Sequence, residues 1–163
     1  MDAFAADVAK LLARDLAGFQ REVAAFPDDE TLWQTVPGLS NSAGNLAWHV
    51  AGNLQAFIGA VLGNSGYVRN RELEFSRRTG TRAETIEELQ RAAAAVERAL
   101  AQLTPEALDA DYPAPLPRDL RIRTGFFLMQ LCVHAGFHLG QAGYARRALT
   151  GDTTSTGPVP LTS

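Results

Sequence analysis

The sequence has little cysteine and no long hydrophobic run, and each scarcity excludes a class of protein. Cys132 is the only cysteine of the 163 residues, so no internal disulfide can form and a reducing compartment suits the chain. No stretch of about 18 apolar residues occurs that would cross a membrane. Charges recur every few residues over residues 1–19, which is not typical of a signal peptide. We therefore expect a cytoplasmic protein without a membrane partner.

Positively charged residues are also fewer than negatively charged ones. Lysine and arginine number 15 against 18 aspartate and glutamate residues, which gives a net charge of -3 and a pI near 5.6. Nucleic acids and anionic lipid surfaces attract clustered positive charge, so neither is an expected partner. With 46% hydrophobic residues, a chain of this length can bury one core without disulfides, which predicts a single domain.

Hydrophobic residues recur at steps of three and four in four long segments, which is the period of amphipathic helices. The segments cover residues 4–26, a stretch from Ser40 or Asn41 to Gly63, residues 81–103 with a capping box at their start, and residues 124–149. Polar or proline-rich connections separate them and leave room for a short extra helical turn or two. The pattern predicts an all-α, up-down four-helix bundle over residues 1–150 and a polar tail over residues 151–163.

The only three histidines fall on inward faces of two of these helices. His134 and His138 lie four residues apart, so their rings share one face of the last helix and can reach one ion. His49 lies on the apolar face of the second helix, and metal sites in bundles are built between facing helices. A single histidine is more often a hydrogen-bonded core residue than a ligand, so the pattern alone leaves both interpretations open.

Three neutral imidazoles would leave a divalent ion with its full charge and with open coordination positions, as in catalytic zinc sites. Such an ion acidifies a bound water or thiol, which then attacks an electrophile near neutral pH. The sequence shows no obvious protein general base beside the histidines, which favours a nucleophile activated by the metal. Cys132 lies two residues from His134 and points away from the histidine face, so we interpret it as a core thiol.

Three segments carry a resemblance to a known family: GNLAWHVAGN at residues 44–53, RNRELEF at residues 69–75 and HAGFHLGQ at residues 134–141. Together they resemble the DinB/YfiT-like superfamily of metal-binding four-helix bundles. The resemblance covers most of the chain. It implies that His49, His134 and His138 hold one divalent metal ion, with zinc or nickel expected first and iron or manganese as alternatives.

The resemblance also carries an expectation about activity. Members studied biochemically include thiol-dependent S-transferases and hydrolases, which implies a metal-dependent enzyme with a small-molecule substrate and a low-molecular-weight thiol as a candidate co-substrate. Many members have no assigned activity, so a non-catalytic metal-binding bundle that acts as a sensor or interaction module is the alternative. Bundles of this family often associate, so a homodimer is expected, although the sequence shows no apolar surface stripe that proves it.

Two amides are candidates for the surroundings of the ligands. Asn53 lies one turn after His49, and Gln141 lies three residues after His138. A metal-bound imidazole donates its second N–H to a fixed acceptor, and an amide oxygen is a suitable one. The alternative is that both amides only line polar edges of the bundle.

Three residues of the polar connection are candidates for substrate binding. Tyr67, Arg69 and Arg71 can reach over the mouth of the site, where two guanidinium groups would bind an anionic substrate. The alternative is a solvated face on which these arginines pair with Glu72 and Glu74. The sequence favours this second interpretation.

Overall fold

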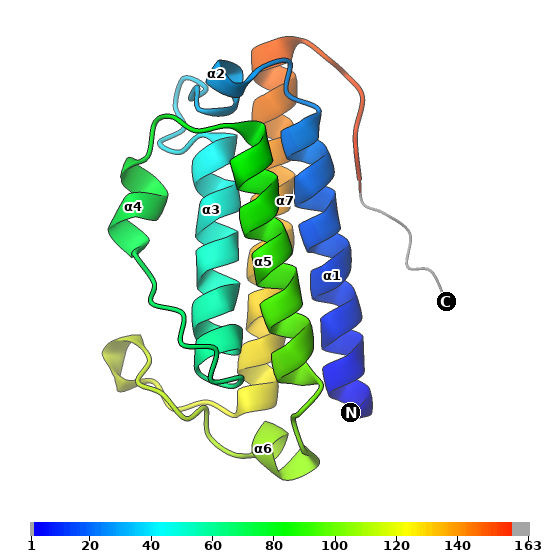
Figure 1. Ribbon diagram of the computed structural model, residues 1–163, viewed down its shortest axis with the longest axis vertical. Coiled ribbons are helices and arrows are strands. Elements are labelled where there is room, and N and C mark those ends of the chain that lie inside the picture. The colour runs from blue at the N-terminus through cyan, green and yellow to red at the C-terminus, as the bar shows by residue number, and fades with distance from the viewer. Residues whose placement is uncertain (1, 158–163) are drawn as a thin grey trace.

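The chain forms a bundle of four long helices in the computed structural model, which describes residues 2–157 (Figure 1). The predicted tail is therefore described only to residue 157, and its last six residues lie outside the described range. The long helices are α1 Ala3–Ala24, α3 Ala43–Leu54, α5 Arg82–Leu100 and α7 Thr124–Thr150. Shorter helical segments in the connections are α2 Asp29–Leu32, α4 Arg71–Ser76, α6 Pro105–Asp109 and the 3-10 helix η2 Pro117–Asp119. The predicted all-α four-helix bundle is confirmed, with more short helices than expected.

Each long helix packs against two neighbours and presents its apolar face to a common core. Helices α1 and α3 both contact α5 and α7, so α1 and α3 lie at opposite corners of the bundle. Full burial of one leucine or phenylalanine side chain contributes roughly 1.5–3 kcal/mol, so this core is the main stabilising element. Its fully buried members include Leu12, Leu16, Phe19, Leu54, Leu89, Leu100 and Leu128. Among the described residues, no helix is long and apolar enough to span a membrane.

Helix α3 begins slightly later than the sequence predicts because Ser42, rather than Ser40 or Asn41, caps it. The Ser42 hydroxyl accepts the Asn45 backbone N–H at 3.1 Å, and the Asn45 side-chain oxygen accepts the Ser42 backbone N–H at 3.2 Å. This capping box satisfies amides that the first helical turn leaves free. The Asn45 amide nitrogen then donates to the carbonyl oxygen of Glu74, so the same residue fastens α4 to α3.

Beyond Leu54 the helix continues as a π-helix, η1 Gln55–Ala60. A π-helical turn is rare, and where one occurs it is frequently next to a functional site. The Gln55 amide donates to the buried Glu88 carboxylate at 2.5 Å, which joins η1 to α5. The second long helix, which the sequence predicts to end at Gly63, therefore ends at Ala60, and its pitch changes at Gln55.

One arginine is buried where α7 ends. The Arg146 Nε lies 2.6 Å from a Glu22 carboxylate oxygen of α1, and its Nη1 lies 2.6 Å from Asp152. Its Nη2 donates to the Thr154 carbonyl oxygen. The start of the predicted tail is thus held against α1 and α7 by one fully buried guanidinium.

Candidate metal centre

The three histidines converge between α3 and α7. The Nε2 atom of His134 lies 3.1 Å from Nε2 of His49 and 3.1 Å from Nε2 of His138. All three ring nitrogens lie within 4.8 Å of one another, and they form a group that can hold a metal ion. His49 is buried and the other two rings are partly buried, so the cluster lies just beneath the surface. The helical spacing that placed them on inward faces thus brings all three together.

A buried carboxylate fixes the orientation of the His49 ring. Glu74 of α4 places Oε2 2.9 Å from Nδ1 of His49. Arg69 approaches the same Nδ1 at 3.1 Å, but its guanidinium also donates twice to the Glu74 carboxylate, at 2.7 and 2.8 Å. A carboxylate can only accept, so the Nδ1 of His49 carries the proton and its Nε2 presents a bare lone pair to the other rings.

A side-chain amide orients the His138 ring in the way that Glu74 orients the His49 ring. Gln141 places Oε1 2.7 Å from Nδ1 of His138, which fixes the proton on Nδ1 and leaves Nε2 free. His134 therefore faces two bare nitrogens, and its single Nε2 hydrogen could satisfy only one of them. Its own Nδ1 is buried and makes no hydrogen bond with any residue that the structure describes. Hydrogen bonds among the rings would therefore leave one ring nitrogen without a donor. A cation placed between the three Nε2 atoms would satisfy all of them.

The protonation states of His134 and His138 also favour a bound cation. Burial, followed by the neighbouring His138 and His49, lowers the pKa of His134 from its ordinary value to about 4. Burial also lowers the pKa of His138, although the Gln141 hydrogen bond opposes it. Both rings are therefore neutral at neutral pH, which is the form that binds metals. Nitrogen ligands at roughly 2.0–2.1 Å from a tetrahedral zinc ion lie roughly 3.3 Å apart, close to the two separations of 3.1 Å.

The role of Glu74 corrects two interpretations made from the sequence. Glu74 is buried rather than part of a solvated face, because α4 packs against α3 and directs this carboxylate inward. It also supplies a carboxylate beside the histidines, where the sequence showed no obvious general base. Burial alone would raise the pKa of Glu74, but the hydrogen bonds from His49 and Arg69 outweigh it, so the pKa is lowered and the group stays ionised.

The other residues that the sequence predicts for the site lie around the three histidines. Asn53 is buried one turn from His49, and its Oδ1 has no hydrogen-bond partner among the described residues. Tyr67 is partly buried, and burial followed by the charges of Glu88 and Glu74 raises its pKa. Arg71 is exposed, and its guanidinium carbon lies over the Phe75 ring, 5.0 Å from the ring centroid. Arg69 is the one of the three connection residues that contacts a histidine, and it does so while paired with the buried carboxylate.

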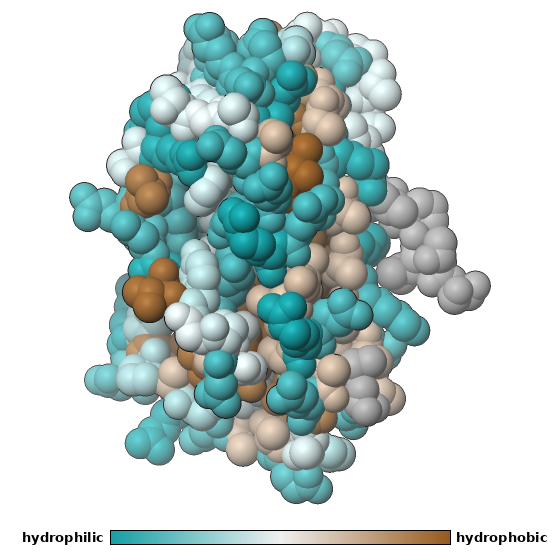
Figure 2. Space-filling view, viewed as in Figure 1, coloured by the Kyte–Doolittle hydropathy of each residue, from teal (hydrophilic) through white to brown (hydrophobic). Residues whose placement is uncertain are grey.

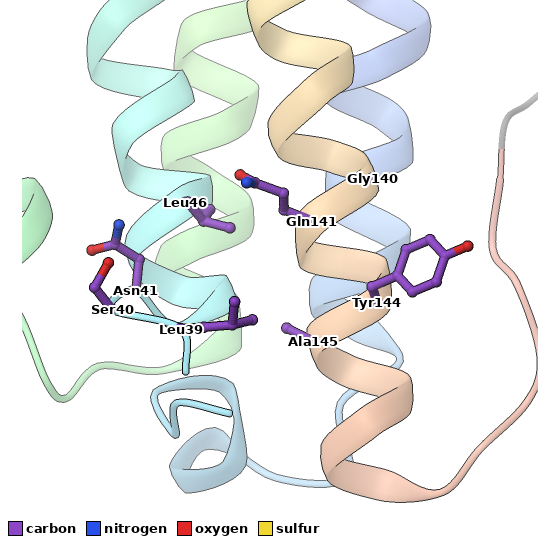
Figure 3. A pocket seen from close by; sticks show the side chains of 8 residues that line it. All are labelled: Leu39, Ser40, Asn41, Leu46, Gly140, Gln141, Tyr144 and Ala145. Carbon is purple, nitrogen blue, oxygen red and sulfur yellow. The ribbon is translucent and has the colours of Figure 1, made fainter. Parts of the chain in front are cut away.

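A groove next to the site is open between α3, α7 and the loop before α3. It has a volume of about 410 Å³. In Figure 3 the Leu46 and Gln141 side chains point into the gap between the two helices, while Tyr144 projects from the outer side of α7. None of the residues that line the groove is charged: Leu39, Ser40, Asn41, Leu46, Gly140, Gln141, Tyr144 and Ala145. Gln141 lines the groove and also contacts His138, so the groove adjoins the histidine cluster, although no histidine lines it.

Cys132 is not positioned for the chemistry. Its side chain is partly buried, and burial followed by the negative charge of Asp15 raises the pKa of its thiol to about 11. The thiol is therefore protonated at neutral pH and a poor nucleophile. The core-thiol interpretation agrees with this placement.

We expect that replacing Gly52 with alanine will disturb the site and the fold together. A methyl group at Gly52 would clash with Oε1 of Glu74, so α4 could not keep its carboxylate against α3. Alanine is favoured over glycine in a helix by about 1 kcal/mol, but overpacking of this kind costs roughly 1–3 kcal/mol. Thermal unfolding of Gly52→Ala should show net destabilisation. Gly140→Ala, where the added methyl meets nothing within 4 Å, is the matched control and should not destabilise the fold.

Comparison with known proteins supports the fold and identifies a family. A family model described as the DinB superfamily matches residues 11–142. A solved structure, that of a conserved protein from Enterococcus faecalis, is similar over 93% of this chain and 99% of its own, with a TM-score of 0.75 and 19% sequence identity. At this identity the similarity shows the fold alone. No match is found among curated proteins.

Proposed function

This chain belongs to the DinB superfamily, which is generally metal-binding, and on that basis we propose that it is a metal-dependent enzyme whose ion is held by His49, His134 and His138. The observation that carries the proposal is the convergence of three histidine Nε2 atoms, two of them with their opposite nitrogens fixed by Glu74 and Gln141. When bound, a divalent ion supplies Lewis acidity and lowers the pKa of a coordinated water or thiol.

The surrounding residues have separable tasks. Glu74 and Gln141 hold the Nδ1 protons, so that both rings keep their lone pairs directed at one point. Arg69 neutralises the buried Glu74 carboxylate and so keeps it ionised without an unpaired charge in the interior. The neutral groove beside Gln141 offers a small molecule a place to bind next to the cluster. A groove in this position favours the enzyme over a sealed metal site that only stabilises the fold.

Within this proposal the reaction is either the transfer of a small thiol to an electrophilic substrate or the hydrolysis of such a substrate. The two share a requirement for a nucleophile activated at the ion, and the chain's own thiol is excluded because Cys132 stays protonated. Zinc or nickel is the proposed metal, since imidazole nitrogen suits both. Because the groove lacks charge, we favour an electrophile whose bound portion is uncharged.

The first test is metal analysis of untagged protein by plasma mass spectrometry. Wild type should carry about one equivalent of a divalent metal, and a His134→Ala, His138→Ala double variant less than about a tenth of that, since one ligand cannot hold the ion. Gln90→Ala, at an exposed position of α5, is the control and should match wild type. A wild-type protein that stays metal-free after incubation with zinc and nickel would contradict the proposal.

The second test addresses catalysis. Metal-loaded wild type should accelerate either the addition of cysteine or glutathione to model electrophiles or the hydrolysis of activated esters, and a chelator should abolish the rate. The His134→Ala, His138→Ala protein serves as the blank. Full metal occupancy with no turnover in either screen would instead support the non-catalytic sensor or interaction module.

A further inference from the structure

The groove between α3 and α7 differs from other cavities of the described chain in its lack of charge. Four further cavities of about 270 to 390 Å³ are each lined by at least two charged residues, whereas this groove is lined by none. Figure 2 shows that the side of the molecule with α4 and α5 is also largely hydrophilic, with hydrophobic side chains in separate spots. A charged ligand would lose its hydration in such a groove without gaining a partner. The lining therefore favours a ligand that is uncharged where it is bound.

One wall of the groove is a leucine that a tight turn holds in place. The Leu39 backbone N–H donates to the Val36 carbonyl oxygen at 2.9 Å, and Gly38 between them has a φ of +87°. Proline followed by a glycine with positive φ is typical of a type II turn, and Pro37 precedes this glycine. The turn fixes the place of Leu39, which is nevertheless 49% exposed. A ligand in the groove can therefore cover an apolar side chain that the chain itself leaves open to water.

The facing walls are apolar as well, and the groove between them is small. Leu46 of α3 and Ala145 of α7 line it and are almost fully buried. In Figure 3 Leu39 lies across the gap from Ala145, and Leu46 lies across it from Gln141. The volume of about 410 Å³ is near the lower end of the range for small-molecule pockets. One ring or a short alkyl chain suits a groove of this size.

Gln141 is the polar residue of the groove whose direction the structure fixes. Its Oε1 accepts the Nδ1 hydrogen of His138 at 2.7 Å, so its Nε2 is at the other end of the amide. This nitrogen makes no hydrogen bond with any residue that the structure describes. An amide nitrogen of this kind donates two hydrogens and accepts none. The groove therefore offers a directed donor, and a ligand oxygen is the group complementary to it.

We propose that the groove binds a part of the substrate that does not react, and that this part is an uncharged apolar group with a carbonyl oxygen that accepts from Nε2 of Gln141. The proposal rests on the proposed function, because it takes the three histidines as the reacting centre. His138 connects the two regions, since its Nδ1 contacts Gln141 and its Nε2 belongs to the histidine cluster. Binding of a remote part of a substrate holds its electrophilic atom at the reacting centre.

An anionic substrate fits this arrangement less well. Arg69, which contacts a histidine, is already paired with the buried Glu74 carboxylate, and the pair carries no net charge to attract an anion. Arg71 is exposed, and its guanidinium lies over the Phe75 ring. Neither guanidinium lines the groove. The two arginines that the sequence suggests for anion binding thus give the groove no positive charge.

Three small probes that share a phenylethyl group test the chemistry of the ligand. They are benzylacetone, which is a neutral ketone without a donor, phenylpropylammonium and phenylpropanoate. Titrated into zinc-loaded wild type and followed by NMR, benzylacetone should shift the side-chain amide signal of Gln141 with a dissociation constant of about 1 mM. The charged probes should bind at least about tenfold more weakly. The titrations are repeated after chelation, which removes direct binding of a probe to the ion.

Two variants test the residues, with circular dichroism to confirm that each is folded. Gln141→Glu keeps an oxygen that accepts from His138 but replaces the amide nitrogen with a second acceptor. It should retain metal, bind benzylacetone about tenfold more weakly and bind phenylpropylammonium more tightly than wild type does. Leu39→Ser should weaken benzylacetone about three- to tenfold, since about half of a leucine's burial is lost. Leu73→Ser, at a leucine of α4 that is 46% exposed, is the control and should match wild type.

Three results would overturn the proposal. The first is a wild type that binds no benzylacetone at concentrations up to about 10 mM. The second is wild-type affinity for this ketone in Gln141→Glu or in Leu39→Ser, and the third is a preference for phenylpropanoate after chelation. Metal analysis decides the proposed function separately. A protein that carries metal but does not bind the ketone contradicts the groove alone, whereas one that binds the ketone but never takes up metal contradicts the enzyme.

Discussion

Glu22→Ala should lower the free energy of unfolding by about 3–5 kcal/mol, because it leaves the Arg146 guanidinium charged in the core. Arg146 is fully buried, and its contact with Glu22 at 2.6 Å is the only one of its two ion pairs in which the partner is also buried. Asp152 and the Thr154 carbonyl oxygen remain as partners of two guanidinium nitrogens, but the buried Nε loses its carboxylate acceptor. For a chain of this size the loss corresponds to a fall in melting temperature of roughly 6–20 °C.

Two further variants isolate the cause. Glu97→Ala removes an exposed carboxylate from α5 and should change stability by less than about 0.5 kcal/mol. Asp152→Asn weakens the other ion pair of Arg146, whose partner is partly exposed, and should cost about 1 kcal/mol or less. Urea unfolding followed by circular dichroism measures all three. Equal effects of Glu22→Ala and Glu97→Ala would contradict the claim that Arg146 depends on its partner.

The bundle and the convergence of the histidines follow from local periodicity. Apolar residues at steps of three and four identify the inward face of each long helix, and His49, His134 and His138 fall on those faces. In an antiparallel pair of neighbouring helices, inward residues near the middle of each helix must meet. The capping box at Thr81 and the left-handed Gly151 after α7 are likewise local signals that fix helix ends.

The carboxylate beside His49 could not be predicted in the same way. Glu74 lies on a helix of six residues, too short for a period to show which face is buried. Its direction depends on distant contacts, namely the Asn45 amide that fastens α4 and the missing side chain of Gly52. The signal available in the sequence was the unusual glycine, one residue before Asn53 and three after His49.

The outer face of α7 was missed for the opposite reason. This helix is apolar on two sides, because the buried stripe through Leu131 and Ala135 is accompanied by the exposed apolar residues Val133 and Phe137 on the opposite side. When both faces are apolar the period becomes weak, and only the packed structure shows which side remains exposed. The sequence therefore predicted the core side of α7 and no surface stripe.

Glu74→Ala should weaken metal binding about 10- to 100-fold, which is the usual cost of removing a carboxylate that orients a metal-ligating histidine. Without this side chain the His49 ring loses the acceptor that keeps its proton on Nδ1. The nearby Arg69 guanidinium, 3.1 Å from the same nitrogen, would then donate to it and favour the tautomer whose Nε2 carries a hydrogen and cannot bind metal. Competition with a chromophoric chelator measures the dissociation constant for zinc.

The controls follow from burial and charge. Glu72→Ala removes an exposed carboxylate from the same short helix and should leave the affinity unchanged. Gln141→Ala removes the acceptor of His138, but this amide is neutral and exposed, so water can take its place and the loss should be smaller than for Glu74→Ala. The order of affinities should therefore be wild type and Glu72→Ala first, then Gln141→Ala, then Glu74→Ala. If Glu74→Ala binds zinc as tightly as wild type while remaining folded, the carboxylate fastens α4 to the bundle and has no part in holding the ligand.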